Sequence, residues 1–357
     1  MSIPWSRVSS DVIEHILSFL YFAPDLSSGI VGLSTKTLRF PVWSAQVRLS
    51  LNAMTAIPFL RRNCTLLSFE NLQMIQAINI ADLMKHNCLH YLNMLSITKA
   101  TSTEHLIACF NVPNGEAFPN LSTLIISNTR FGDLGMRVLA NAINRCFLPG
   151  IRSFVLNYNT IGDEGMFDLS DCIRNGMLRK LDCLYMVGNQ FTRKGVESMC
   201  SGIRSGHLSN LTAINLSSNH IDSKGVLAFA NVLKFLTSIQ TLMLGGNFIT
   251  GDDVVPIMNG ITSSGATLKE LSLPLCQITN SGIRDLVDAA TAVRMQRLDF
   301  LNLCNNRIDA SGARVFLEAT ENGVFPKLIS VYLSKNQISA SMQETLSRVE
   351  RIQIRCF

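Results

Sequence analysis

The chain has 357 residues, of which 47% are hydrophobic and 16% are charged, and its formal net charge is +5. This composition is too apolar for a disordered chain, and so mild a positive charge does not by itself indicate a nucleic-acid-binding protein. The longest apolar run, residues 16–23, is shorter than the roughly 20 residues that a membrane-spanning helix needs. The first eleven residues lack a cationic start followed by an apolar block, so we expect no signal peptide and a cytoplasmic, or else nuclear, protein.

The first fifty residues carry a different pattern from the rest of the chain. Residues 8–20, VSSDVIEHILSFL, space their apolar side chains as one face of a helix. A second short helix is expected around Val31, followed by a strand at residues 47–51. The pattern predicts a small helical module over residues 1–50 and a repeat domain over residues 51–357.

One phrase, L-x-x-L-x-L-x-x-N-x-I, then recurs at intervals of 28 to 32 residues. The alternation at positions 1, 4 and 6 predicts a short strand whose aliphatic side chains face a core. A degenerate unit is expected at residues 64–88, and a closing strand at residues 349–357 with Ile352 and Ile354 inward. The units start at Leu89, Leu121, Ile151, Leu181, Leu211, Ile239, Leu268, Leu298 and Leu328.

Position 9 of the phrase is usually asparagine. An amide there can hydrogen-bond backbone groups left unpaired as the chain leaves the strand, each of which would otherwise cost about 1–3 kcal/mol when buried. Thr129 and Cys276 replace the amide in two units, where we expect a looser turn. The asparagines at this position are Asn159, Asn189, Asn219, Asn247, Asn306 and Asn336.

A helix start follows each strand. Position 12 usually carries a side-chain oxygen that suits an N-cap, and apolar triplets spaced i, i+3, i+7 predict one buried stripe per helix. The residues at position 12 are Gly132, Gly162, Thr192, Asp222, Thr250, Thr279, Asp309 and Ser339. The clearest triplets are Met136/Leu139/Ile143, Met166/Leu169/Ile173 and Val196/Met199/Ile203.

A single strand and helix cannot enclose a core, but stacked neighbours can, so the repeat predicts an α/β solenoid. The units resemble leucine-rich repeats of the ribonuclease-inhibitor type, over about residues 89–345. The resemblance implies a horseshoe of about nine to ten repeats, with parallel strands on the concave side and helices on the convex side.

The helical module resembles an F-box, which docks on the adaptor of SCF-type ubiquitin ligases. Residues 11–20, DVIEHILSFL, match the family's helix, and Trp43 precedes the expected strand as the family's tryptophan does. Val8-Ser9 stands in place of the usual leucine-proline, and no tryptophan follows Lys36. A plain cap over the first open core of the solenoid is the alternative. The resemblance implies adaptor contact through Val8, Val12, Ile13, Ile16, Leu17 and Leu20.

Positions 3, 5 and 7 of each strand are expected to face the concave side, where only Glu270 is charged. Such a face lacks the rows of Lys and Arg that phosphate groups require, so we expect a protein partner and no nucleic acid. Tyrosine and asparagine on a rigid surface suit protein recognition. The predicted partner-binding residues are Tyr91, Asn93, Tyr158, Tyr185, Asn215, Met243, Gly245, Glu270, Phe300, Asn302 and Tyr332.

A shelf for a partner's side chain is predicted where small residues follow three successive strands. Gly245→Arg is then expected to block the shelf without loss of stability, although small residues are also common at such turns. Pro274 lacks an N–H and is expected to interrupt the strand ladder. The small pairs are Val187-Gly188, Ser217-Ser218 and Gly245-Gly246, with Tyr158 before them and Pro274-Leu275 after them.

No pattern typical of a catalytic, cofactor or metal site is found: the six histidines show no ligand spacing and the ten cysteines include no CxxC pair. We therefore expect a non-enzymatic protein without metal or cofactor. The preferred function is a substrate receptor of an SCF-type ligase, and the alternative is a scaffold or inhibitor of the ribonuclease-inhibitor kind. The repeats also resemble those of Ran GTPase-activating proteins, for which Arg130 or Arg307 on a rim loop is the candidate arginine.

Overall fold

The computed structural model describes residues 31–34, 66–70, 90–100, 103–110, 118–265, 267–293, 297–349 and 352–356. The chain divides into two compact units, Met1–Asn159 (unit 1) and Thr160–Phe357 (unit 2), each of which is described by itself. The six predicted adaptor contacts between Val8 and Leu20, and the predicted strand at residues 47–51, lie outside the described residues. The described helices include none that is long and apolar enough to span a bilayer.

In unit 1, β1 pairs with β2 in antiparallel fashion, whereas β2 to β5 pair with one another in parallel and in sequence order. The expectation of a helix around Val31 is wrong, because Val31–Ser34 form a strand that pairs with β2. The described elements of unit 1 are β1 (Val31–Ser34), β2 (Leu66–Glu70), β3 (Met94–Thr98), α5 (Thr103–Phe110), β4 (Thr123–Ser127), α6 (Gly132–Asn144) and β5 (Ser153–Val155).

The repeat at β3 begins three residues later than the sequence predicts. β3 pairs with β4 so that Leu95 lies opposite Leu124. Leu92, Leu95 and Ile97 are fully buried, so they occupy positions 1, 4 and 6, and the start at Leu89 is wrong. Leu95 therefore faces the core and not the concave side.

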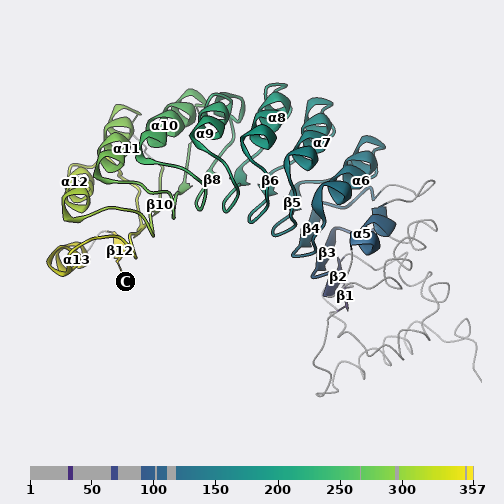
Figure 1. Ribbon diagram of the computed structural model, residues 1–357, viewed down its shortest axis with the longest axis horizontal. Coiled ribbons are helices and arrows are strands. Elements are labelled where there is room, and N and C mark those ends of the chain that lie inside the picture. The colour runs from purple at the N-terminus through teal and green to yellow at the C-terminus, as the bar shows by residue number, and fades with distance from the viewer. Residues whose placement is uncertain are drawn as a thin grey trace, which may run out of the picture. The chain divides into compact units, whose positions relative to one another are not determined.

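In unit 2, strands β6 to β12 pair in sequence order and all in parallel. The strands lie along the inner side of a curved row, and helices α7 to α13 lie along its outer side (Figure 1). The expected α/β solenoid, with concave strands and convex helices, is thus confirmed. Its elements are α7 (Asp163–Arg174), β6 (Cys183–Tyr185), α8 (Arg193–Ile203), β7 (Ala213–Asn215), α9 (Ser223–Ala230), η2 (Leu233–Phe235), β8 (Thr241–Met243), η3 (Gly251–Asp253), α10 (Val254–Ser263), β9 (Glu270–Ser272), α11 (Asn280–Val293), β10 (Phe300–Asn302), α12 (Ala310–Glu321), β11 (Ser330–Tyr332), α13 (Ala340–Ser347) and β12 (Gln353–Arg355).

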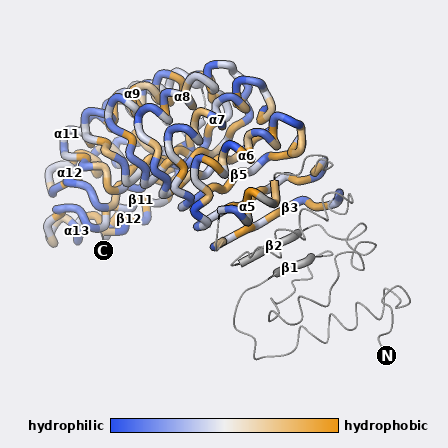
Figure 2. The backbone as a smooth tube through the Cα atoms, turned by 45° about the vertical axis from the view of Figure 1, so that its right-hand side comes forward, coloured by the Kyte–Doolittle hydropathy of each residue, from blue (hydrophilic) through white to orange (hydrophobic). Residues whose placement is uncertain are grey.

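The core of unit 2 fills the space between its strands and its helices. Leu181, Leu184 and Met186 occupy positions 1, 4 and 6 of one repeat and are fully buried, as is the predicted stripe of α8. Figure 2 shows this pattern as hydrophobic stretches that alternate with hydrophilic ones in each repeat. Burial of each large aliphatic side chain stabilises the fold by about 1.5–3 kcal/mol. At the C-terminal end, Ile352 is buried and Ile354 is half-buried.

The asparagines at position 9 form a ladder in which all but one of the amides close the turn of the preceding repeat. The exception is Asn219, whose amide donates to the Met186 carbonyl at 3.0 Å but whose buried carbonyl oxygen accepts no hydrogen bond from the described residues. The Asn306 carbonyl oxygen accepts from the backbone N–H groups of Cys276 and Ile278 at 3.0 Å each, and its amide donates to the Leu273 carbonyl at 2.9 Å. The position-9 side chains Asn159, Asn189, Asn247 and Asn336 accept from, or donate to, the preceding repeat in the same way.

The looser turn expected at Thr129 and Cys276 is not found. Both residues are buried, and their backbone N–H groups donate to Asn159 and Asn306 respectively. The Thr129 hydroxyl also donates to Asn159 at 2.8 Å. Because the amide that closes a turn comes from the next repeat, a repeat without its own asparagine still has a tight turn.

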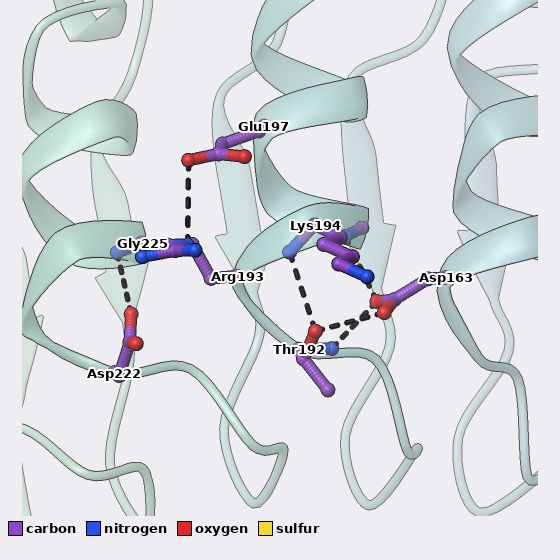
Figure 3. A network of polar contacts seen from close by, with 8 residues as sticks. Asp163, Thr192, Arg193, Lys194, Glu197, Asp222 and Gly225 are labelled. Atoms are coloured by element: carbon purple, nitrogen blue, oxygen red, sulfur yellow. Dashed lines mark hydrogen bonds and ion pairs between the residues drawn. The ribbon is translucent and has the colours of Figure 1, made fainter.

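The helix starts are held by side-chain caps as expected, and by one contact that the sequence did not suggest. Thr192, Asp222 and Asp309 each accept a backbone N–H from the first turn of their own helix, whereas Ser339 makes no such bond. In addition, the Asp163 carboxylate reaches the next repeat and accepts from the backbone N–H and the hydroxyl of Thr192, at 2.7 and 2.8 Å (Figure 3). Successive helices are therefore tied together at their N-terminal ends.

Removal of one asparagine side chain from the ladder should destabilise unit 2 strongly. Asn306→Ala leaves the buried N–H groups of Cys276 and Ile278 without an acceptor, so we expect the free energy of unfolding to fall by about 3 kcal/mol. Urea denaturation followed by circular dichroism measures this change. As a control, Asn322→Ala removes an exposed asparagine at the C-terminus of α12 and should change stability by less than about 0.5 kcal/mol. Equal effects of the two substitutions would contradict the ladder.

The buried thiols should be unreactive in the folded protein. Burial raises the pKa of the Cys109, Cys172, Cys200 and Cys276 thiols to about 12, so at pH 8 they are almost entirely protonated and are not nucleophilic. We expect iodoacetamide at pH 8 to modify the exposed Cys146 and to spare these four until the chain is denatured. Peptide mass mapping checks this expectation, and modification of the four at the rate of Cys146 would refute it.

Candidate protein-binding face

The concave face of unit 2 is formed by the side chains at positions 3 and 5 of strands β6 to β12. Paired strands lie about 4.8 Å apart, so residues at the same position of successive strands are neighbours. Row three, aligned by the register of the strands, contains Cys183, Ala213, Thr241, Glu270, Phe300, Ser330 and Gln353. Row five contains Tyr185, Asn215, Met243, Ser272, Asn302, Tyr332 and Arg355.

The half of the face that contains Tyr185 is held in place by its own side-chain contacts. The Asn215 amide donates to the Met243 sulfur at 3.0 Å, and its carbonyl oxygen accepts from the Ser217 backbone N–H at 3.0 Å. Burial raises the pKa of the Tyr185 phenol, and a hydrogen bond with Cys183 raises it further. Side chains that are ordered before binding lose little entropy when a partner arrives, which favours recognition.

An aromatic cluster occupies the other half of the face. The rings of Phe300 and Tyr332 meet edge to face with their centroids 5.0 Å apart. The Arg355 guanidinium lies over the opposite side of this cluster, 5.0 Å from the centre of the Tyr332 ring. The sequence did not identify Arg355, although alignment of the closing strand with β11 would have placed it opposite Tyr332.

Glu270 lies between the two halves, on β9. Burial raises the pKa of its carboxyl group, and the nearby Asp299 carboxylate raises it further, whereas a hydrogen bond from Thr241 lowers it. Its neighbour in row five, Ser272, is only 8% exposed, so the side chains around it cover it almost completely. The ion pairs formed among the described residues of unit 2 include none with Glu270.

The predicted shelf at Gly245 does not exist. A Cβ atom on Gly245 would lie 2.3 Å from Cδ of Pro274, so there is no open space above this glycine, and Gly245→Arg would disrupt packing instead of only blocking a surface. The small residues after the strands have a backbone cause. Gly188, Ser218 and Gly246 at position 8 all have a positive φ, between 56° and 69°, a conformation that glycine adopts without strain because it has no Cβ atom.

Bulky residues at position 8 adopt the same backbone conformation and point into solvent. Tyr158 and Leu275 have φ values of 56° and 57°, and each side chain is 57% exposed. Tyr158 lies in unit 1, as do Tyr91 and Asn93, which are exposed and precede β3 instead of forming part of it. The predicted residues that unit 2 brings together on its concave face are Tyr185, Asn215, Met243, Glu270, Phe300, Asn302 and Tyr332.

Pro274 does not interrupt the ladder of strands. Its carbonyl accepts from the Gly246 N–H at 2.8 Å, and the N–H groups of Leu273 and Leu275 on either side of it donate to the next strand. The N–H at position 7 is not part of the ladder, since in Ser217 it donates to the Asn215 side chain of its own strand. A proline at this position therefore removes no inter-strand hydrogen bond.

A comparison with protein-family models agrees with this architecture. A family model described as a leucine-rich repeat matches residues 151–170, 207–230 and 266–287. The comparison with curated proteins returns no match. Among solved structures, the chain is similar to an internalin (inlF) from Listeria monocytogenes, with 16% identity, a TM-score of 0.43, and coverage of 100% of this chain and 98% of the other. The matched repeats and the stacked units of parallel strand and helix show that the chain has the fold of a leucine-rich repeat solenoid.

Proposed function

We propose that this protein is a receptor that binds another polypeptide on the concave face of unit 2. One observation carries the proposal: ordered, largely uncharged aromatic, thioether and amide side chains stand in two rows on a hydrogen-bonded sheet. Large side chains that are already ordered provide contact area at a low entropic cost, and such a neutral surface suits a protein better than a polyanion.

We further propose that the receptor serves an SCF-type ubiquitin ligase. Support comes from the F-box-like residues 11–20 and from Trp43. In this function the chain makes and breaks no covalent bond. It holds a client on the concave face and the ligase adaptor at the F-box-like residues near the N-terminus, which raises the effective concentration of the client near the transfer machinery.

A substitution in the middle of the concave face should abolish client capture without unfolding the protein. Met243→Arg places a long charged side chain at the centre of row five, and we expect it to reduce client capture at least tenfold with little change in melting temperature. Affinity capture followed by mass spectrometry measures the first quantity, and calorimetry measures the second.

Two further variants make this test specific. Leu227→Arg introduces the same charge on α9, where Leu227 is 48% exposed, and should leave capture intact. Gly245→Arg should lower the melting temperature, because Pro274 occupies the space that its side chain needs. Unchanged capture by Met243→Arg would refute binding on this face.

The ligase function is tested at the other end of the chain. Full-length protein should co-purify with the ligase adaptor, and deletion of residues 1–45 should abolish that association while the client and the melting temperature of the repeats are retained. If the N-terminal helices are only a cap, the adaptor is never captured and the deletion lowers the melting temperature.

The same capture experiment distinguishes the alternatives. A scaffold or inhibitor would retain its partner and never bring down the adaptor. A GTPase activator of the Ran type would accelerate GTP hydrolysis in a purified assay and lose that effect on change of Arg130 or Arg307, both of which are exposed on turns that follow strands.

A further inference from the structure

We infer that the concave face of unit 2 selects a polypeptide segment that carries a lysine or arginine, and that Glu270 receives this side chain. The inference rests on the proposed binding of a polypeptide to this face, and it specifies the chemistry of the partner. Three features support it: the distribution of charge along the two rows, the surroundings of Glu270, and the aromatic groups beside it.

The charge distribution favours a basic residue at the centre of the face. Among the side chains of rows three and five, only Glu270 and Arg355 carry a formal charge. Arg355 stands on the last strand and is engaged with the Tyr332 ring, whereas Glu270 stands on β9, in the interior of the sheet. Asp299, just before β10, adds a second negative charge near Glu270.

The surroundings of Glu270 leave its charge incompletely balanced. The side chain is partly buried, and the described part of unit 2 places a threonine hydroxyl and a second carboxylate near it, with no cation at ion-pair distance. A carboxylate in this position gains more from an incoming ammonium or guanidinium group than a fully hydrated one would.

The neighbours of Glu270 also fit the aliphatic part of a basic side chain. Phe300 lies next to Glu270 in row three, Tyr332 packs against Phe300, and Met243 stands diagonally across from Glu270 on β8. Lysine and arginine pack their methylene chains on such groups while the charged end reaches a carboxylate. Arg355 over Tyr332 shows that this surface already accommodates one guanidinium against an aromatic ring.

Selection of peptides from a random library tests the inference directly. Phage that display random twelve-residue peptides are selected on the full-length protein and on full-length Glu270→Gln, Glu270→Lys and Glu318→Gln. Glu318 is an exposed glutamate on α12, so Glu318→Gln removes the same charge away from the concave face. We expect the wild-type protein and Glu318→Gln to enrich Lys or Arg at one peptide position, Glu270→Gln to lose this preference, and Glu270→Lys to replace it with Asp or Glu.

The peptide that binds most tightly is then used to measure how much the contact with Glu270 contributes to affinity. Replacement of its basic residue by norleucine should weaken binding to the wild-type protein by about tenfold or more, as is typical for a hydrogen-bonded charge pair, and should have little effect on binding to Glu270→Gln. The difference between the two effects isolates the contact with Glu270. Equal losses in both proteins would overturn the inference.

The pH dependence of peptide binding provides an independent test of the role of Glu270. Asp299 and Tyr185 interact electrostatically with Glu270, the exposed Lys269 directly precedes it in the chain, and the pKa of Glu270 is raised by burial and by Asp299. A protonated carboxyl group cannot pair with a cation, so wild-type affinity for the basic peptide should fall as the pH is lowered through this raised pKa. Glu270→Gln should show a flatter profile, and an identical profile would assign the effect to Asp299 and overturn the inference.

The result also separates this inference from the broader proposal. If Met243→Arg abolishes client capture but the preference for basic peptides survives in Glu270→Gln, only the role of Glu270 is wrong. If the wild-type protein enriches no basic peptide, or an acidic one, the inference is overturned while client capture still tests the concave face. If Met243→Arg leaves client capture unchanged, the proposed binding face itself is wrong.

Discussion

The hydrogen bonds of the asparagine ladder are the constraint on which the rest of unit 2 depends. A strand that ends in a tight buried turn leaves backbone N–H groups that its own repeat cannot satisfy, and Asn306 satisfies those of the turn before it. The turns that precede Asn159, Asn189, Asn247, Asn306 and Asn336 are therefore completed by the following repeat, whereas the buried carbonyl oxygen of Asn219 accepts no hydrogen bond from the described part of the chain. Neighbouring repeats are coupled through buried polar contacts as well as through apolar packing, which gives the solenoid a rigid sheet and not a flexible string of units.

This rigidity leaves the concave side chains free to serve recognition. The side chains at positions 1, 4 and 6 form the core, and those at position 9 form the ladder. The residue at position 8 has a left-handed backbone conformation, and the N–H at position 7 does not join the inter-strand hydrogen bonds. Position 3 carries none of these duties, and position 5 contributes only where an asparagine accepts the N–H of position 7, as Asn215 and Asn302 do. Most side chains of the two rows are therefore not required by the fold, so their chemistry reflects the partner more than the architecture.

The sequence predicted the strands and helices because each depends on the local spacing of its apolar residues. Its predictions failed where a contact with a residue distant in the sequence determines the structure. The leucines and the asparagine column predicted the strands, the positions of the turns and several of the caps in unit 2, but not the tight turn at Cys276 or the missing cap bond of Ser339. Leu89, Leu92 and Leu95 fit the phrase in two registers three residues apart, and only pairing with the next strand selects one. Likewise, no pattern shows that Pro274 covers Gly245, or that the amide closing the turn at Cys276 belongs to the following repeat.

Of all the residues in rows three and five, Glu270 is the one whose presence is least explained by the needs of the fold. The uncharged residues of row three, such as Thr241 and Phe300, pack or hydrogen-bond at no electrostatic cost, and a threonine or serine on β9 would do the same. A partly buried carboxylate beside Asp299 instead makes the free protein less stable, and the Thr241 hydrogen bond offsets only part of this effect. An unfavourable charge at the centre of a ready-made binding surface is accounted for when a partner's cation neutralises it, because the energy lost in the free protein is then recovered in the complex.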